Sequence, residues 1–151
     1  MSLMQDVSAA ITAAMKQRDE QRLGALRLLK AALMNREVER GRALAPDEEL
    51  QVVTTLVKQR RESIEQFSRG GRQDLVDREQ AELQVLQAYL PPALDDEALG
   101  RLVQEVIVET GASSPKDMGR VMKTVMARIP AGAADGKAVS ERVKTELARK
   151  A

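Results

Sequence analysis

The chain has 151 residues, 43% of them hydrophobic but only 1% aromatic, so any core must be built from aliphatic side chains and methionine. Its 24 basic and 23 acidic residues nearly cancel, which excludes a wholesale polyelectrolyte tail but leaves room for a local basic patch. Cys and His are both absent, which excludes disulfides, thiol chemistry, and the commonest general base and metal ligand.

No apolar stretch approaches the ~20 residues that a transmembrane helix needs. The N-terminus also lacks the charged start and apolar segment of a secretory signal. From these two absences we expect a cytoplasmic protein without a membrane partner, and we expect it to be a monomer.

Apolar residues recur at steps of three and four along the first ninety residues, which is the spacing of amphipathic helices. The steps predict four helices, which run from Leu3 through Ala14, from Leu23 to a stop at Gly41, from Pro46 to Arg69, and from Gln73 to Leu90. Arg60 falls on the core positions of the third helix, between Val57 and Ile64. It therefore either extends its charge past the core or makes a polar contact between helices.

Pro91 and Pro92 break the helical pattern, because proline lacks a backbone donor and restricts the residue before it. We place a boundary here, between an N-terminal helical module (residues 1–90) and a tail module (residues 91–151). The sequence pattern of the tail predicts three shorter helices, which run from Asp95 to Gly111, from Ser114 to Ile129, and onward from an N-cap at Asp135. No segment alternates with period two, so the predicted fold is all-α.

Candidate catalytic motifs have ordinary structural explanations. No serine lies in a Gly-rich elbow, and no segment has the spacing of a phosphate-binding loop. The pairs Glu48/Glu49 and Asp95/Asp96 open helices, where acids are expected in any case. Lys58/Glu62 and Arg61/Glu65 are spaced as neutralising pairs on one helix. We therefore expect no metal, no cofactor and no chemistry of the chain's own.

The predicted sixth helix combines an apolar side with a basic stripe. At about 100° per residue, Lys116, Arg120 and Lys123 share a narrow stripe opposite the apolar residues. Asp117 is expected to lie well off this stripe, so the three cations have no acidic neighbour on it. Unpaired cations of this kind form a candidate phosphate-binding surface. The alternative is an ordinary solvated face. Gly119 weakens the helix, so it marks either close packing or the close approach of a partner.

Taken in order, several segments resemble the GatB/YqeY family, over roughly residues 4–150. Three segments of the first module resemble free-standing YqeY-like proteins: KQRRESIEQF at 58–67, GRQDLV at 71–76 and YLP at 89–91. Three segments of the tail are similar to the helical tail of the tRNA-dependent amidotransferase B subunit: ETGASS at 109–114, KDMGRVMK at 116–123 and ADG at 134–136. The order and spacing of the segments make the resemblance specific.

The resemblance implies an elongated N-terminal part with a long helical hairpin, and a compact three-helix tail. In the amidotransferase that tail contacts tRNA, and related domains are attached to some glutaminyl-tRNA synthetases. Carried over by motif, tRNA binding falls on Lys116, Arg120 and Lys123, with Gly119 at the position of close approach. Relatives often have a basic residue before the Ala-Asp-Gly motif. This chain has Ala133 there, and we expect this to reduce the positive charge of the surface.

The leading hypothesis is a tRNA-binding accessory protein without chemistry of its own, with an aminoacyl-tRNA synthetase or an amidotransferase as a further partner. The second hypothesis is a carbon–nitrogen ligase that uses glutamine as amido-N-donor. The chain shows neither the nucleotide-binding loop nor the amidase segment that such a ligase needs. The third hypothesis is a protein-binding helical scaffold that uses the long third and fourth helices.

Overall fold

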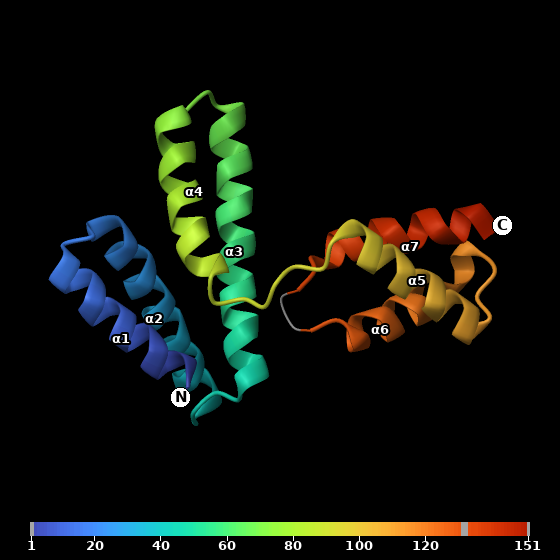
Figure 1. Cartoon of the computed structure of the whole chain (residues 1–151), viewed down its shortest axis with the longest axis horizontal. Coiled ribbons are helices and arrows are strands. Elements are labelled where there is room, and N and C mark those ends of the chain that lie inside the picture. Colours follow the sequence, from blue (N-terminus) through green and yellow to red (C-terminus); the bar gives the residue numbers. More distant parts are fainter. Residues whose placement is uncertain (1, 131–132, 151) are drawn as a thin grey trace. The chain divides into compact units, whose positions relative to one another are not determined.

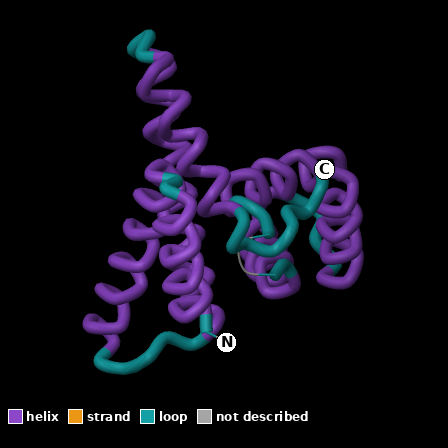
Figure 2. Tube along the Cα trace, turned by 60° about the vertical axis from the view of Figure 1, so that its left-hand side comes forward, coloured by secondary structure: helices purple, strands orange, loops and turns teal. Residues whose placement is uncertain are grey.

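The computed structural model describes residues 2–130 and 133–150. Within them the chain is helical, with loops and turns between the helices and no strand (Figure 1, Figure 2). The all-α prediction is therefore confirmed. The helices are α1 (Leu3–Gln17), α2 (Glu20–Arg40), α3 (Pro46–Arg69), α4 (Gln73–Gln87), α5 (Asp96–Thr110), the 3₁₀ turn η1 (Pro115–Asp117), α6 (Met118–Arg128) and α7 (Gly136–Lys150).

The chain divides into two compact units, Met1–Leu90 and Pro91–Ala151. In the first unit, α1 pairs with α2, and α3 and α4 form a hairpin that packs against α2 (Figure 1). Burial of aliphatic side chains stabilises this unit, at about 1.5–3 kcal/mol for each large side chain removed from water. The core residues are Val7, Ala14, Leu26, Leu29, Leu33, Val52, Val53, Leu56, Val57 and Leu86.

The α3–α4 hairpin is buried along only part of its length. The buried residues of α3 end at Val57, and the predicted core positions Ile64 and Phe67 are only half-buried. Helix α4 ends at Gln87 rather than at the predicted Leu90, and a turn covers the residues before Pro91. The outer part of the hairpin is therefore held by the contact between its two helices more than by a core.

The second unit packs α5, α6 and α7 around one aliphatic core. Asp95 caps α5, because its Oδ1 accepts a hydrogen bond from the Ala98 N–H at 2.7 Å. The segment before α5 is joined to the segment before α7 by a hydrogen bond from the Leu94 N–H to the Ala133 carbonyl at 2.8 Å. The core residues are Leu99, Val103, Val106, Ile107, Ala112, Val121, Val125, Ile129, Ala133, Val139, Val143 and Leu147.

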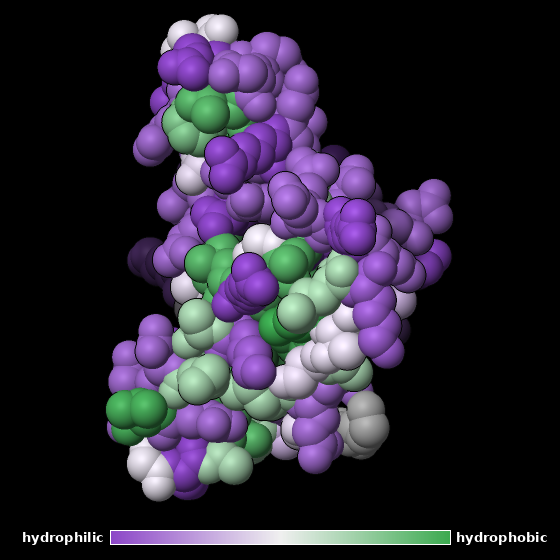
Figure 3. All heavy atoms as spheres, turned by 90° about the vertical axis from the view of Figure 1, so that its left-hand side faces the viewer, coloured by the Kyte–Doolittle hydropathy of each residue, from purple (hydrophilic) through white to green (hydrophobic). Residues whose placement is uncertain are grey.

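On the face drawn in Figure 3, hydrophilic side chains cover most of the area, and hydrophobic ones gather in patches between them. Among the described residues of the first unit, large apolar side chains are exposed at Met15 (54%), Met34 (50%) and Val38 (80%). Of the helices in the described residues, none combines the length and apolar character that crossing a membrane demands.

Candidate nucleic-acid interface

The 3₁₀ turn η1 leads from the α5–η1 loop into α6. Asp117 stabilises this turn, because its Oδ2 accepts a hydrogen bond from the Ser113 N–H at 3.0 Å. This hydrogen bond is the main reason that the pKa of Asp117 is lowered. The predicted start is borne out in place, since Ser114 precedes a helical turn that begins at Pro115, but this first turn is 3₁₀, α6 itself begins at Met118, and the Ser114 side chain makes no capping hydrogen bond.

Helix α6 buries one side and exposes the other. Val121 and Val125 are fully buried in the core of the second unit, with Met118 and Met122 packed beside them. The predicted binding residues lie on the exposed side or in η1, and we call the surface that they form the α6 basic face: Lys116, Gly119, Arg120 and Lys123. The structure thus leaves these side chains free of the core.

One acid reaches the α6 basic face, contrary to the sequence expectation. Asp117 Oδ1 lies 3.3 Å from Arg120 Nη2, because residues three apart lie one turn apart on a helix. The Arg120 side chain is 56% exposed, and a pair this open to solvent contributes little to stability. Lys116 and Lys123 form no ion pair with any residue that the structure describes. The expectation that Asp117 lies off the stripe is therefore corrected, and two of the three cations stay unpaired.

Gly119 is exposed, and its surroundings are open. A Cβ atom built on Gly119 would meet nothing within 4 Å, and its backbone φ is not positive. Close packing within the unit and backbone strain are therefore both excluded as reasons for a glycine here. The close approach of a partner, the other explanation that the sequence offered, stays a prediction.

Ala133 has a different role from the one expected. Its side chain is only 2% exposed and belongs to the core of the second unit. A small apolar residue suits this buried site, because a charged side chain without a partner is costly to bury. The effect of Ala133 on the positive surface stays a prediction, and what the structure adds is that this residue belongs to the core.

The last cation of α6 is paired. Arg128 forms an ion pair with Glu109 near the end of α5, and the contact lowers the pKa of the Glu109 carboxyl. Arg128 therefore neutralises an acid of its own unit and is not part of the α6 basic face. In the residues that the structure describes, no three acidic side chains gather closely enough to hold a metal ion.

The first unit contains a polar contact that the sequence indicated only in part. Arg60 of α3 reaches across the hairpin to α4, where its Nε lies 3.3 Å from Glu79 Oε2 and 3.1 Å from Glu82 Oε2. Of the two explanations given for Arg60, the polar contact between helices is the one observed.

The predicted neutralising pairs beside Arg60 are absent from the described residues. Glu65 pairs with Arg69 one turn further on, rather than with Arg61. Lys58 and Arg61 are exposed. The α3 surface therefore has two cations without an acidic partner in the part of the chain that the structure describes.

Three similar proteins bear the name "Altered inheritance of mitochondria protein 41, mitochondrial". The one from Eremothecium gossypii is 38% identical over 103 residues, which cover 66% of this chain and 54% of that protein. The one from Pyrenophora tritici-repentis is 28% identical over 147 residues, which cover 95% and 80% of the two chains. The third, from Lachancea thermotolerans, is 28% identical over 117 residues, which cover 76% and 60%. The chain thus spans about half the length of the first relative.

The names of these relatives contradict the predicted cytoplasmic location, because each relative is named as a mitochondrial protein. The prediction was wrong in its reasoning: the lack of an apolar span and of a secretory signal does not distinguish one aqueous compartment from another.

A sequence profile described as YqeY-like protein matches residues 4–147, which is nearly the whole chain. The match covers both units and every residue of the α6 basic face, and it agrees with the resemblance seen in the segments at 58–67 and 116–123. The chain therefore belongs to the YqeY-like protein family.

Proposed function

We propose that the protein is an accessory factor that binds tRNA, with the α6 basic face as its contact to the phosphate backbone. The observation that supports this is the exposure of three cations on one short segment, only one of them touched by a carboxylate. The resemblance of residues 109–136 to the amidotransferase tail supports tRNA as the polyanion. An amidotransferase or an aminoacyl-tRNA synthetase is the kind of enzyme that such a factor would assist.

The chemistry of the three side chains suits phosphate. Lys116 and Lys123 are compact point charges, while the guanidinium of Arg120 offers several donors to one phosphate group. Asp117 does not prevent this, since its contact to Arg120 uses Nη2 and leaves the other donors of that guanidinium available. If each cation meets one phosphate, the slope of log K against log salt concentration should be about −2 to −3.

Gly119 adds a steric argument. Its open surroundings allow a sugar–phosphate backbone to come close to the α6 backbone between Lys116 and Arg120. A side chain at this position would hold the backbone away from both cations. The proposal therefore predicts that bulk at Gly119 weakens binding even though the charge is unchanged.

The test is a filter-binding titration with total tRNA at two salt concentrations. We expect K116E/R120E/K123E to weaken binding roughly tenfold or more and to flatten the salt dependence, because three phosphate contacts become repulsive. The matched control is K16E/K58E/R61E, which makes the same change of charge on exposed residues of the first unit. Circular dichroism checks that both variants keep their helices.

Two outcomes contradict the proposal. Unchanged affinity in the α6 triple variant removes this face from tRNA binding. An equal loss in both triple variants shows attraction by overall charge alone, without a site. A loss confined to the α6 variant supports the proposal.

A further inference from the structure

A buried carboxylate joins α5 to α7 in the second unit. Glu146 of α7 is only 5% exposed, and it accepts hydrogen bonds from three side chains. Arg142 Nε and Arg149 Nη1 both lie 3.2 Å from Glu146 Oε1, so the two guanidinium groups converge on one oxygen. Gln104 of α5 donates to Glu146 Oε2 at 3.3 Å.

The Arg142 guanidinium lies directly against the α5 backbone. A Cβ atom built on Gly100 would come within 2.2 Å of Arg142 Nη2, so only glycine leaves this space free. Glycine inside a helix costs roughly 1 kcal/mol relative to alanine. Glycine at this position leaves free the space that the Arg142 guanidinium occupies.

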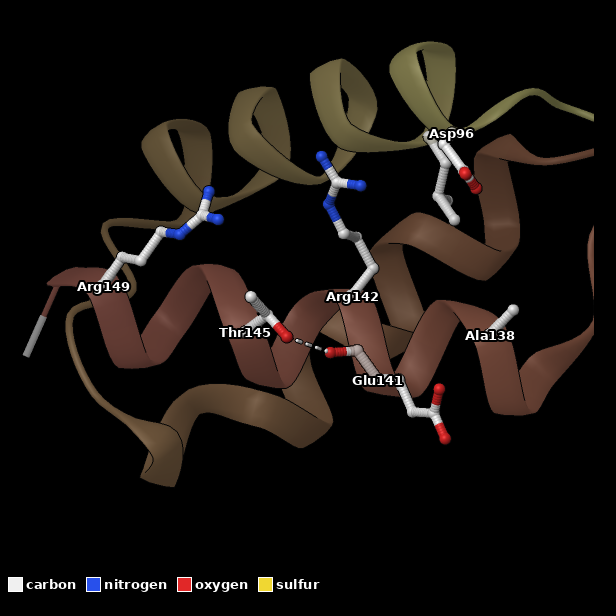
Figure 4. A pocket seen from close by; sticks show the side chains of 7 residues that line it. Asp96, Ala138, Glu141, Arg142, Thr145 and Arg149 are labelled. Carbon is white, nitrogen blue, oxygen red and sulfur yellow. Dashed lines mark hydrogen bonds between the residues drawn. The ribbon is translucent and has the colours of Figure 1, made fainter.

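Most donors of the two arginines remain unused. Among the described residues, the Nη1 and Nη2 groups of Arg142 and the Nε and Nη2 groups of Arg149 meet no acceptor. Both side chains line a groove between α5 and α7, together with Thr145, and Figure 4 shows both extending from α7 toward α5. The groove therefore presents charged donors that the protein itself does not satisfy.

The charge of the cluster also favours an anion. Two guanidinium groups share one carboxylate, which leaves one positive charge on this network. Asp96 and Glu141 also line the groove, but Figure 4 shows the carboxylate of Glu141 directed away from Arg142. The network of Glu146 and its two arginines therefore carries its excess positive charge beside the free donors, with Asp96 as a further acid of the same groove.

We propose that this groove binds a compact oxyanion of the phosphate type, held by the free guanidinium donors of Arg142 and Arg149. Gly100 leaves space for the Arg142 guanidinium, and Glu146 accepts a hydrogen bond from each arginine. Fork-shaped guanidinium donors match the oxygens of a phosphate group. The proposal is independent of the α6 basic face, because it uses residues of α5 and α7 alone.

The test is an NMR titration of the full chain that follows the arginine Nε–Hε signals and the Gly100 amide. One series adds inorganic phosphate at constant ionic strength, and the other adds an RNA duplex without terminal phosphates. Saturable shifts with phosphate alone identify a free phosphate group as the ligand, and saturable shifts with RNA alone identify a backbone phosphodiester. Shifts that do not saturate in either series overturn the proposal.

Two variants and one control separate anion binding from a merely structural contact. In the series that shows saturation, G100A displaces the Arg142 guanidinium without removing it, and R149Q removes the more exposed arginine. Each should weaken binding about tenfold through loss of charge-assisted hydrogen bonds. In the phosphate series, G119A is the matched glycine control and should leave the affinity unchanged. Unchanged affinity in both G100A and R149Q overturns the proposal, and their thermal unfolding checks that the fold is kept.

Discussion

The two units each contain an ion cluster between helices, and the two clusters have opposite composition. In the first unit one arginine, Arg60, meets two carboxylates, and all three side chains are 18–19% exposed. In the second unit one carboxylate, Glu146, meets two arginines, whose exposed fractions are 34% and 68%. The first cluster has excess negative charge in a mostly closed contact, and the second has excess positive charge beside a groove.

From this difference we expect a structural role for the Arg60 cluster and a binding role for the Glu146 cluster. Arg60 is mostly buried against two acids of α4, so we expect its effect mainly in stability. The arginines around Glu146 keep unused donors that face solvent, so changes there should affect both stability and anion binding. The predictions below test this distinction.

The largest effect is expected for R60A. It leaves Glu79 and Glu82 facing each other, half-buried and without a cation, which should lower the free energy of unfolding by about 2–3 kcal/mol. Urea unfolding measures this loss. The exposed neighbour Arg61 gives the control, because R61A should change stability by less than about 0.5 kcal/mol.

Neutralising the whole Arg60 cluster sharpens the test. In R60M/E79Q/E82Q no charge is left without a partner, so most of the stability lost in R60A should return. If the triple variant is as unstable as R60A, the loss comes from packing and not from charge. The tRNA affinity should be the same in all these variants, because the α6 basic face is untouched.

A smaller effect is expected for E146Q, which should lower stability and raise phosphate affinity. Stability should fall by about 1–2 kcal/mol, because two arginines lose their shared carboxylate while the Gln side chain keeps its size. Phosphate affinity should rise, since the cluster gains one net positive charge. Thermal unfolding and the phosphate titration measure the two quantities. A fall in both would show that Glu146 is needed to position the arginines.

The two helical glycines Gly100 and Gly119 give the next comparison. G119A should stabilise the protein by about half a kcal/mol, because the site is open and alanine is the better helix former. The gain from G100A should be smaller, because its Cβ must first displace Arg142. Thermal unfolding ranks the two. Larger stabilisation by G100A would show that the Arg142 guanidinium moves without cost.

The sequence predicted the helices because their ends are marked by local chemistry. Gly41 and Gly111 adopt positive φ values of 71° and 69° at the ends of α2 and α5, where glycine is favoured. Pro46 starts α3, and the second unit begins at Pro91. Such signals depend on neighbouring residues alone.

The contacts of the candidate sites depend on geometry that the sequence does not show. Arg60 stood out on a core position, but its partners follow from how α4 is aligned against α3. Asp117 and Arg120 are spaced three residues apart, so their contact could have been expected from the sequence, whereas the 3₁₀ turn before α6 could not. Gly100 and Arg142 are far apart in the sequence, so nothing near either residue indicated their contact.

The smallest expected effect and the most specific test concern Glu48. Like Glu146, it is a carboxylate that contacts two arginines. It contacts Arg40 at 3.2 Å and Arg42 at 2.7 Å, and it accepts a hydrogen bond from the Ala45 N–H at the start of α3. Hydrogen bonds from Arg42 and Ala45 lower the pKa of Glu48 to about 2, from an ordinary value of 4.5.

Because this pKa is lowered in the folded state, Glu48 stabilises the fold fully above pH 4.5. The stabilisation is lost as the pH falls from 4.5 toward about 2. An NMR titration of the Glu48 carboxyl carbon should show a midpoint near 2, and R42Q should raise it. In E48Q this part of the acid dependence of stability should disappear. A midpoint near 4.5 would mean that the contacts of Arg40 and Arg42 do not hold the Glu48 carboxylate in solution.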